Sequence, residues 1–215
     1  MADKINIDQR ITELIREEPH FGIKWTLDRS LEDDEPSRFL LMFNGTVFWS
    51  NVGQTPDIPE EIEVGSIEVI RVQRLRAELA GQSLFEVCDC YSQAIYDVYS
   101  DLFEEPECEW NAAAEQLIKD STANDLLIIQ NLTVYSPLIA EDLGHRLVIE
   151  IAKTFSDDCA LIAMVPWPLR PNPKGLEVAT EVELLQARVY WSRIGFERVA
   201  DSHCWAVNPE VLISR

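Results

Sequence analysis

One stretch of this sequence has the residue types and spacing of an anion-binding turn. Residues 132–147 read LTVYSPLIAEDLGHRL, in which an apolar strand ends, a short turn follows and a helix begins. At such a junction, backbone N–H groups and the positive end of the helix dipole point at one spot. That spot suits a pyrophosphate group, although an ordinary strand-to-helix turn shows the same pattern.

A second stretch predicts a helix that ends beside the start of a strand. Residues 187–196 read ARVYWSRIGF. We expect this helix to end at Arg193, with Gly195 closing its C-terminus and Phe196 entering the next strand, because a glycine just past a helix accepts the left-handed backbone that such an ending requires.

Taken together, the two stretches resemble the GNAT N-acetyltransferase superfamily. In that family a strand ending in Val-x-Pro leads through a turn of the type Arg-Gly-x-Gly-x-Gly into a helix, and a later helix ends in Ala-x-x-Phe-Tyr-x-x-x-Gly-Phe. The distance from Val134 to Gly144 matches the family spacing without a gap, as does the order of elements after residue 120. The resemblance covers residues 121–207, under half of the chain.

The resemblance implies a mixed, mostly antiparallel sheet with helices on both faces, and it implies binding of acetyl-CoA. In the family the turn amides hold the pyrophosphate, and the end of the strand pairs with the pantetheine arm. Carried over by position, the cofactor-binding residues are Leu132, Val134, Ile139, Ala140, Asp142, Leu143, Gly144, His145 and Arg146.

Three turn residues depart from the family pattern. The leading Arg falls on Ile139, the first Gly on Ala140 and the middle Gly on Asp142, so that only Gly144 is kept. Asp142 and its neighbour Glu141 place negative charge where the pyrophosphate would sit. Two like charges about 4 Å apart repel by about 4 kcal/mol at an effective dielectric of 20.

The general acid expected from the resemblance is also displaced. The family's tyrosine, which protonates the leaving thiolate, lies four residues before the closing glycine, and here that position holds Trp191. An indole N–H cannot act as an acid at accessible pH. The adjacent Tyr190 is the candidate catalytic residue if the helix register shifts; otherwise we expect it at the family's apolar core position.

Two functions follow as hypotheses. The first is an acyl-CoA-dependent N-acyltransferase that moves an acetyl group to a small-molecule or peptide amine, with a cationic acceptor favoured by the acidic sequence. The second is a non-catalytic GNAT-like binding or regulatory protein whose acidic surface binds a basic protein. A DNA mimic is a third reading, and it depends on charge alone.

The charge of the chain restricts its partners. The chain of 215 residues has a net charge of −20, and its residues 1–110 hold 24 acidic and 9 basic side chains. This balance argues against direct binding of nucleic acid, because contacts to phosphates need clustered Lys and Arg. It permits amines, polyamines and basic protein segments as partners.

Other features of the composition bear on the class of protein. No apolar run reaches the ~20 residues that cross a bilayer, and the start, MADKINIDQR, lacks a signal-peptide core, so we expect no membrane partner and a cytoplasmic location. The five cysteines are expected to be reduced thiols without a metal site. Strand addition between exposed edges would make a homodimer, which the sequence leaves open.

These segments must be positioned by a single GNAT-like domain over residues 1–215. Its acidic N-terminal half, 1–120, diverges from the family, and 121–207 is the recognisable cofactor-binding half. Helices are predicted at 8–18, 83–103, 111–119, 143–155 and 181–193. Strands are predicted at 21–27, 39–51 with a hairpin at Asn44-Gly45, 66–78 with a bulge between Val69 and Ile70, 125–135, 159–165 and within 196–207, with a loop at 52–65.

Overall fold

The computed structural model describes residues 9–17, 19–29, 35–53, 55, 57–104, 108–119, 121–134, 142–168 and 179–214. Its strands are β1 (Phe21–Asp28), β2 (Leu40–Ser50), β3 (Glu61–Val72), β4 (Phe103–Glu104), β5 (Glu109–Trp110), β6 (Asp125–Val134), β7 (Cys159–Met164), β8 (Glu197–Arg198) and β9 (Trp205–Val207). Its helices are α1 (Gln9–Glu17), the 3-10 turn η1 (Pro36–Phe39), α2 (Arg74–Leu79), α3 (Leu84–Asp89), α4 (Gln93–Leu102), α5 (Ala112–Ile118), α6 (Leu143–Phe155), α7 (Glu181–Ser192) and α8 (Pro209–Ile213).

The centre of the fold is a seven-stranded sheet in the order β1-β2-β3-β6-β7-β9-β8. All neighbouring pairs are antiparallel except β6 and β7, which are parallel and joined through α6. The sheet therefore takes its first three strands from the acidic half of the chain and the rest from the second half. This arrangement confirms the mixed, mostly antiparallel sheet predicted from the sequence.

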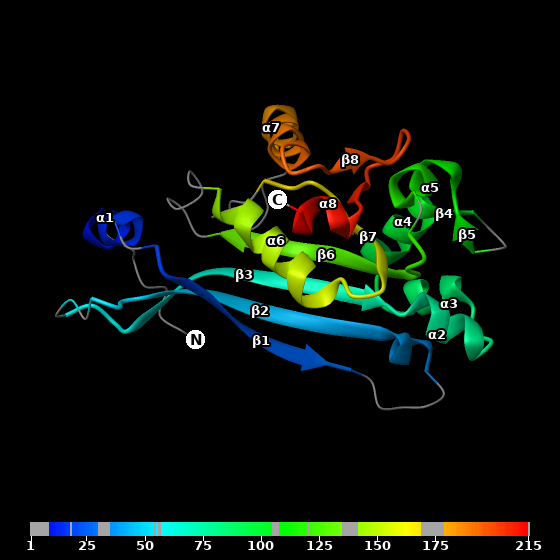
Figure 1. The fold of residues 1–215 in the computed structure, drawn as a ribbon, viewed down its shortest axis with the longest axis horizontal. Coiled ribbons are helices and arrows are strands. Elements are labelled where there is room, and N and C mark those ends of the chain that lie inside the picture. Colours follow the sequence, from blue (N-terminus) through cyan, green and yellow to red (C-terminus); the bar gives the residue numbers. More distant parts are fainter. Residues whose placement is uncertain are drawn as a thin grey trace.

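Helices cover both faces of this sheet, as predicted. One face packs against α1, α6, α7 and α8, which contribute the buried residues Ile15, Leu147, Val148, Ile151, Trp191 and Leu212. The opposite face packs against α2 to α5, with the buried residues Ala77, Val87, Ile95, Tyr99 and Ala114. In Figure 1 the helices α2 to α5 gather at one end of the sheet, where β3 ends and β6 begins, so they cover only part of their face.

The predicted hairpin at Asn44-Gly45 is wrong, because β2 runs straight through both residues and pairs with β1 and β3 on either side. Gly45 lies opposite Trp25 in β1, and a Cβ added to Gly45 would come within 2.7 Å of the Trp25 indole. The glycine therefore makes room for a cross-strand ring instead of supplying a turn.

Several predicted boundaries in the N-terminal half also change. The predicted strand at 66–78 begins at Glu61 instead, inside the predicted loop, and ends at Val72, after which Arg74 starts α2. The predicted long helix 83–103 is two helices, α3 and α4. Ser92 separates them, because its extended backbone leaves the helix and its side chain accepts the N–H of Ile95 as an N-cap.

The predictions for the second half agree closely with the structure. Helix α6 has the predicted bounds, and β7 ends one residue before its predicted end. The predicted end of β6, Tyr135, lies outside the described residues. The short strands β4 and β5 and the helix α8 were not predicted, because elements of two to five residues carry too little periodicity to recognise. No helix among the described residues is long and apolar enough to span a membrane.

Candidate functional site

The strands β6 and β7 separate at one end of the sheet. The parallel pairing of β6 with β7 ends at Ile129 and Met164, whereas β6 continues to pair with β3 as far as Val134. Pro166 and Pro168 follow β7, and proline has no N–H to donate to a sheet ladder. Within the described residues, the β6 edge from Gln130 to Val134 therefore has no strand partner on the β7 side.

A β-bulge marks the point of separation. Val69 pairs with Ile129 and Glu68 pairs with Asn131, so Gln130 is the extra residue on β6. The irregularity predicted between Val69 and Ile70 lies one residue earlier on β3, between Glu68 and Val69, and its extra residue is on β6. The Gln130 Oε1 atom is buried without a hydrogen-bond partner among the described residues, a situation that costs roughly 1–3 kcal/mol in a folded protein.

The N-terminus of α6 follows β6 in the chain, and Tyr190 of α7 occupies it. The Tyr190 hydroxyl accepts the backbone N–H of His145 at 3.1 Å, and its ring stacks on the His145 imidazole with centroids 3.8 Å apart. The His145 Nε2 atom lies 2.9 Å from the Tyr190 carbonyl oxygen and donates to it, because a carbonyl only accepts. The amides expected to hold a pyrophosphate therefore already have an acceptor from this chain.

The electrostatics of this cluster keep Tyr190 protonated. Burial raises the pKa of Tyr190 to about 12, the charge of Asp142 adds to this rise, and the N–H groups of His145 and Gly144 oppose it. Asp142 precedes the helix with a left-handed backbone, and its carboxylate Oδ1 lies 3.5 Å from His145 Nδ1. At neutral pH the phenol thus keeps its own proton and serves as an acceptor for the helix amides.

The structure brings together some of the predicted site residues. Asp142, Gly144, His145 and Tyr190 meet at the start of α6, and Leu132 and Val134 lie on the open stretch of β6. Of the other predicted residues that the structure describes, Leu143 and Arg146 do not join them.

Leu143 is buried in the core, and Arg146 lies over the Phe21 ring of β1, 5.7 Å from its centroid. Ile139 and Ala140 fall outside the described residues. Trp191 is buried in the core at 2 % exposure, and Tyr190 is half-buried and packs against the same core.

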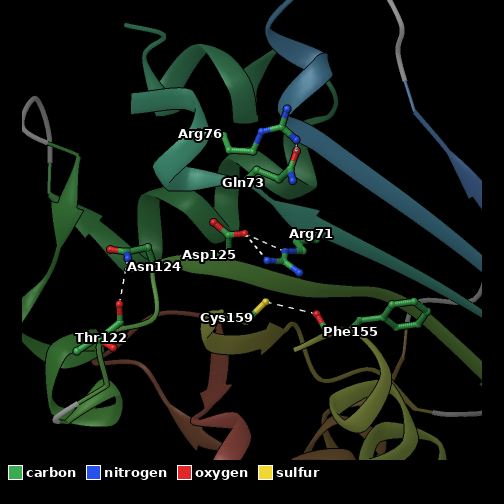
Figure 2. A network of polar contacts seen from close by, with 8 residues as sticks. All are labelled: Arg71, Gln73, Arg76, Thr122, Asn124, Asp125, Phe155 and Cys159. Atoms are coloured by element: carbon green, nitrogen blue, oxygen red, sulfur yellow. Dashed lines mark hydrogen bonds and ion pairs between the residues drawn. The ribbon is translucent and has the colours of Figure 1, made fainter. Parts of the chain in front are cut away.

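The opposite end of β6 carries a polar network of a different kind. Arg71 of β3 donates from Nε and Nη2 to the same Asp125 carboxylate oxygen, at 2.8 and 2.7 Å (Figure 2). Burial raises the pKa of Asp125, although Arg71 pulls it down. Because this pair lies at the start of β6, the end remote from the separation, we regard it as a structural clamp between β3 and β6.

A polar groove crosses the same face of the sheet as α2 to α5, in the part that these helices leave uncovered. It has a volume of about 440 Å³ and is lined by β1, β2, β3 and β6. One row of cross-strand neighbours runs through it, formed by Thr26, Asn44, Glu68 and Asn131. Sequence reasoning missed this groove, because the hairpin assigned at Asn44 removed that residue from the sheet face.

No group of His, Cys, Asp and Glu among the described residues is arranged to hold a metal ion. Comparison with protein-family models, with curated proteins and with solved structures found no match to this chain.

Proposed function

We propose that this chain is a GNAT-like, acyl-CoA-dependent N-acyltransferase that moves an acetyl group from acetyl-CoA to an amine. The observation that carries the proposal is the open edge of β6 beside the departing β7, followed in the chain by the N-terminus of α6. A pantetheine arm is a chain of amides, so it can add to an unpaired strand edge through backbone hydrogen bonds.

The bulge supports the same ligand. Gln130 lies where the strands separate, and its buried Oε1 lacks a donor among the described residues. A pantetheine arm brings two amide N–H groups, either of which would supply that donor. Binding would thus supply a donor to a polar group that the described residues leave without one.

The start of α6 is the proposed place for the pyrophosphate. Its Gly144 and His145 amides and its helix dipole favour an anion, whereas the Asp142 carboxylate opposes one. The Tyr190 hydroxyl must leave these amides before a phosphate oxygen can reach them. We therefore propose that acetyl-CoA binds here in competition with Tyr190.

The reaction would be a direct transfer. The neutral amine nitrogen attacks the thioester carbonyl carbon, the C–S bond breaks, and the new amide nitrogen gives up a proton to a carboxylate or water. The leaving thiolate takes a proton. Tyr190 is the proposed donor, because it is the phenol at the start of α6, whereas the indole N–H of Trp191 cannot act as an acid and is buried in the core.

Isothermal titration of the protein with acetyl-CoA tests the proposal. We expect saturable binding below millimolar ligand, with pantetheine and adenosine 3′,5′-bisphosphate each binding more weakly than the whole molecule. The absence of binding up to millimolar acetyl-CoA would overturn the proposal.

The second candidate is a non-catalytic GNAT-like binding or regulatory protein with a basic partner. The observation that favours it is the engagement of the α6 amides by Tyr190, together with Asp142 beside them, because both discourage an anionic ligand. A basic protein captured by the acidic N-terminal half, combined with no acetyl-CoA binding, would favour this candidate. Acetyl transfer to an amine without such a partner would exclude it.

A further inference from the structure

The polar groove on the sheet face contains a carboxylate, Glu68, that has no ion-pair partner among the described residues. Glu68 of β3 lines the groove and is half-buried. Within the described residues, no Lys, Arg or His forms an ion pair with it. Lys24 also lines the groove, but its ammonium pairs with Glu61 and lies over the Phe48 ring, 4.7 Å from its centroid.

The neighbours of Glu68 make the groove suited to a hydrogen-bonding cation. Asn44 lies directly across from it on β2 and Asn131 on β6, so two amide side chains flank the carboxylate. Burial raises the pKa of Tyr91, in the turn between α3 and α4, and the charges of Glu68 and Asp28 raise it further. Glu68 and Asp28 therefore both lie near enough to Tyr91 for their charges to act on its hydroxyl.

The groove also lies beside the proposed acetyl-CoA site. Glu68 pairs with Asn131, which immediately follows the bulge residue Gln130 where β6 and β7 separate. The helix α6 packs on the other face of the sheet, so a ligand in the groove would approach the separation from the face opposite to α6. The size of the groove, about 440 Å³, is within the range of small-molecule sites.

We propose that this groove binds the ammonium group of a primary amine, with Glu68 as its counter-charge and the Asn44 and Asn131 side chains as hydrogen-bond acceptors. The binding of the amine does not depend on the proposed function, but its role as the acceptor of an acetyl group does. An ammonium offers three donors, and Asn44, Glu68 and Asn131 are cross-strand neighbours that all line the groove. The Asn131 Oδ1 atom accepts the Thr133 hydroxyl at 3.1 Å and has a second lone pair for the ligand. Such charge-assisted hydrogen bonds are stronger than neutral ones.

The test is an NMR titration of the full chain with 1,4-diaminobutane in the absence of acetyl-CoA. We expect saturable shifts of the Asn44 and Asn131 side-chain amides, and none from 1,4-butanediol, which has the same length and no charge. Glu68→Gln keeps the shape of the side chain and removes its charge, and we expect it to weaken binding by roughly tenfold to a hundredfold.

A matched control separates the groove from the overall acidity of the chain. Glu150→Gln removes an exposed carboxylate from α6, on the other side of the sheet, and we expect less than a twofold change. Equal weakening by both variants, or amine shifts away from the groove, would overturn the proposal.

A second variant keeps the test decisive if Glu68→Gln does not fold. Asn44→Lys introduces a tethered ammonium opposite Glu68 at an exposed position, and we expect it to abolish diamine binding. Unchanged affinity in Asn44→Lys would contradict the proposal. Because acetyl-CoA is absent from these titrations, they test the amine site alone. The proposed acyltransferase function is tested by the separate titration with acetyl-CoA.

Discussion

Replacing Tyr190 by Phe removes the hydroxyl that occupies the start of α6. In the free protein this hydroxyl accepts the His145 N–H at 3.1 Å, and the Gly144 N–H also acts on it. If the pyrophosphate of acetyl-CoA uses the same amides, the wild-type protein must break these hydrogen bonds before it can bind. The phenylalanine variant does not bear that cost.

The magnitude follows from the two contacts. A hydrogen bond in a protein contributes about 0.5–1.5 kcal/mol net, so two of them amount to about 1–3 kcal/mol, and 1.4 kcal/mol is tenfold in affinity. We therefore expect Tyr190→Phe to bind coenzyme A at least several-fold more tightly by isothermal titration. The affinity for pantetheine, which lacks the pyrophosphate, should not change.

Asp142→Asn tests the electrostatic half of the same reasoning. Its side chain is 69 % exposed, so water screens its charge, and repulsion of a phosphate about 4 Å away falls to about 1 kcal/mol. We expect about a fivefold gain in coenzyme A affinity that shrinks at high salt.

One result with the Tyr190→Phe variant would refute the assignment of the α6 amides to the pyrophosphate: coenzyme A binding that is weaker than in the wild-type protein. A change in pantetheine affinity equal to the change in coenzyme A affinity would refute it as well.

Three further predictions concern the scaffold and its thiols. Arg71→Met should lower the free energy of unfolding by about 3 kcal/mol in urea denaturation, because it leaves the buried Asp125 carboxylate without its partner. Arg71→Met combined with Asp125→Leu should recover part of this loss. An unchanged stability of Arg71→Met would show that the pair does not clamp β3 to β6. Gly45→Ala should lower the free energy of unfolding by about 1–3 kcal/mol, since the added Cβ would meet the Trp25 indole. The same substitution should have a smaller effect in a Trp25→Leu protein, and an equal effect there would contradict the steric explanation. A thiol reagent should label the exposed Cys90 before the buried Cys88 and Cys204. Burial, and then the charges of Asp89 and Glu35, raise the pKa of Cys90, so its labelling rate should keep rising with pH after the rate of a free cysteine has levelled off. A rate that levels off at the same pH as that of a free cysteine would refute the raised pKa.

The sequence predicted the second half of the fold well because its elements are long and strongly patterned. The apolar face of α6, with Leu147, Val148 and Ile151 at helical spacing, has one structural solution, and the bounds of the helix follow from it. In the first half, Asn44-Gly45 has the local chemistry of a hairpin, but packing against Trp25 decides its conformation. Local chemistry cannot reveal such a long-range contact.

The candidate site divides along the same line. Leu132, Val134, Asp142 and Gly144 could be named from the sequence, because a strand, a turn and a helix are contiguous there. The capping of α6 by Tyr190 could not, since it joins residues 45 positions apart through side-chain geometry. The groove could not either, because Asn44, Glu68 and Asn131 become neighbours only through the register of three strands.

The most direct measurement of the proposed function is a backbone amide NMR map of the protein titrated with acetyl-CoA. We predict saturable shifts at Gln130–Val134 on the open edge of β6 and at Gly144 and His145 on α6, with residues near Arg71 at the far end of β6 unchanged. The absence of shifts, or shifts that spare both the β6 edge and the start of α6, would contradict the proposed acyltransferase site.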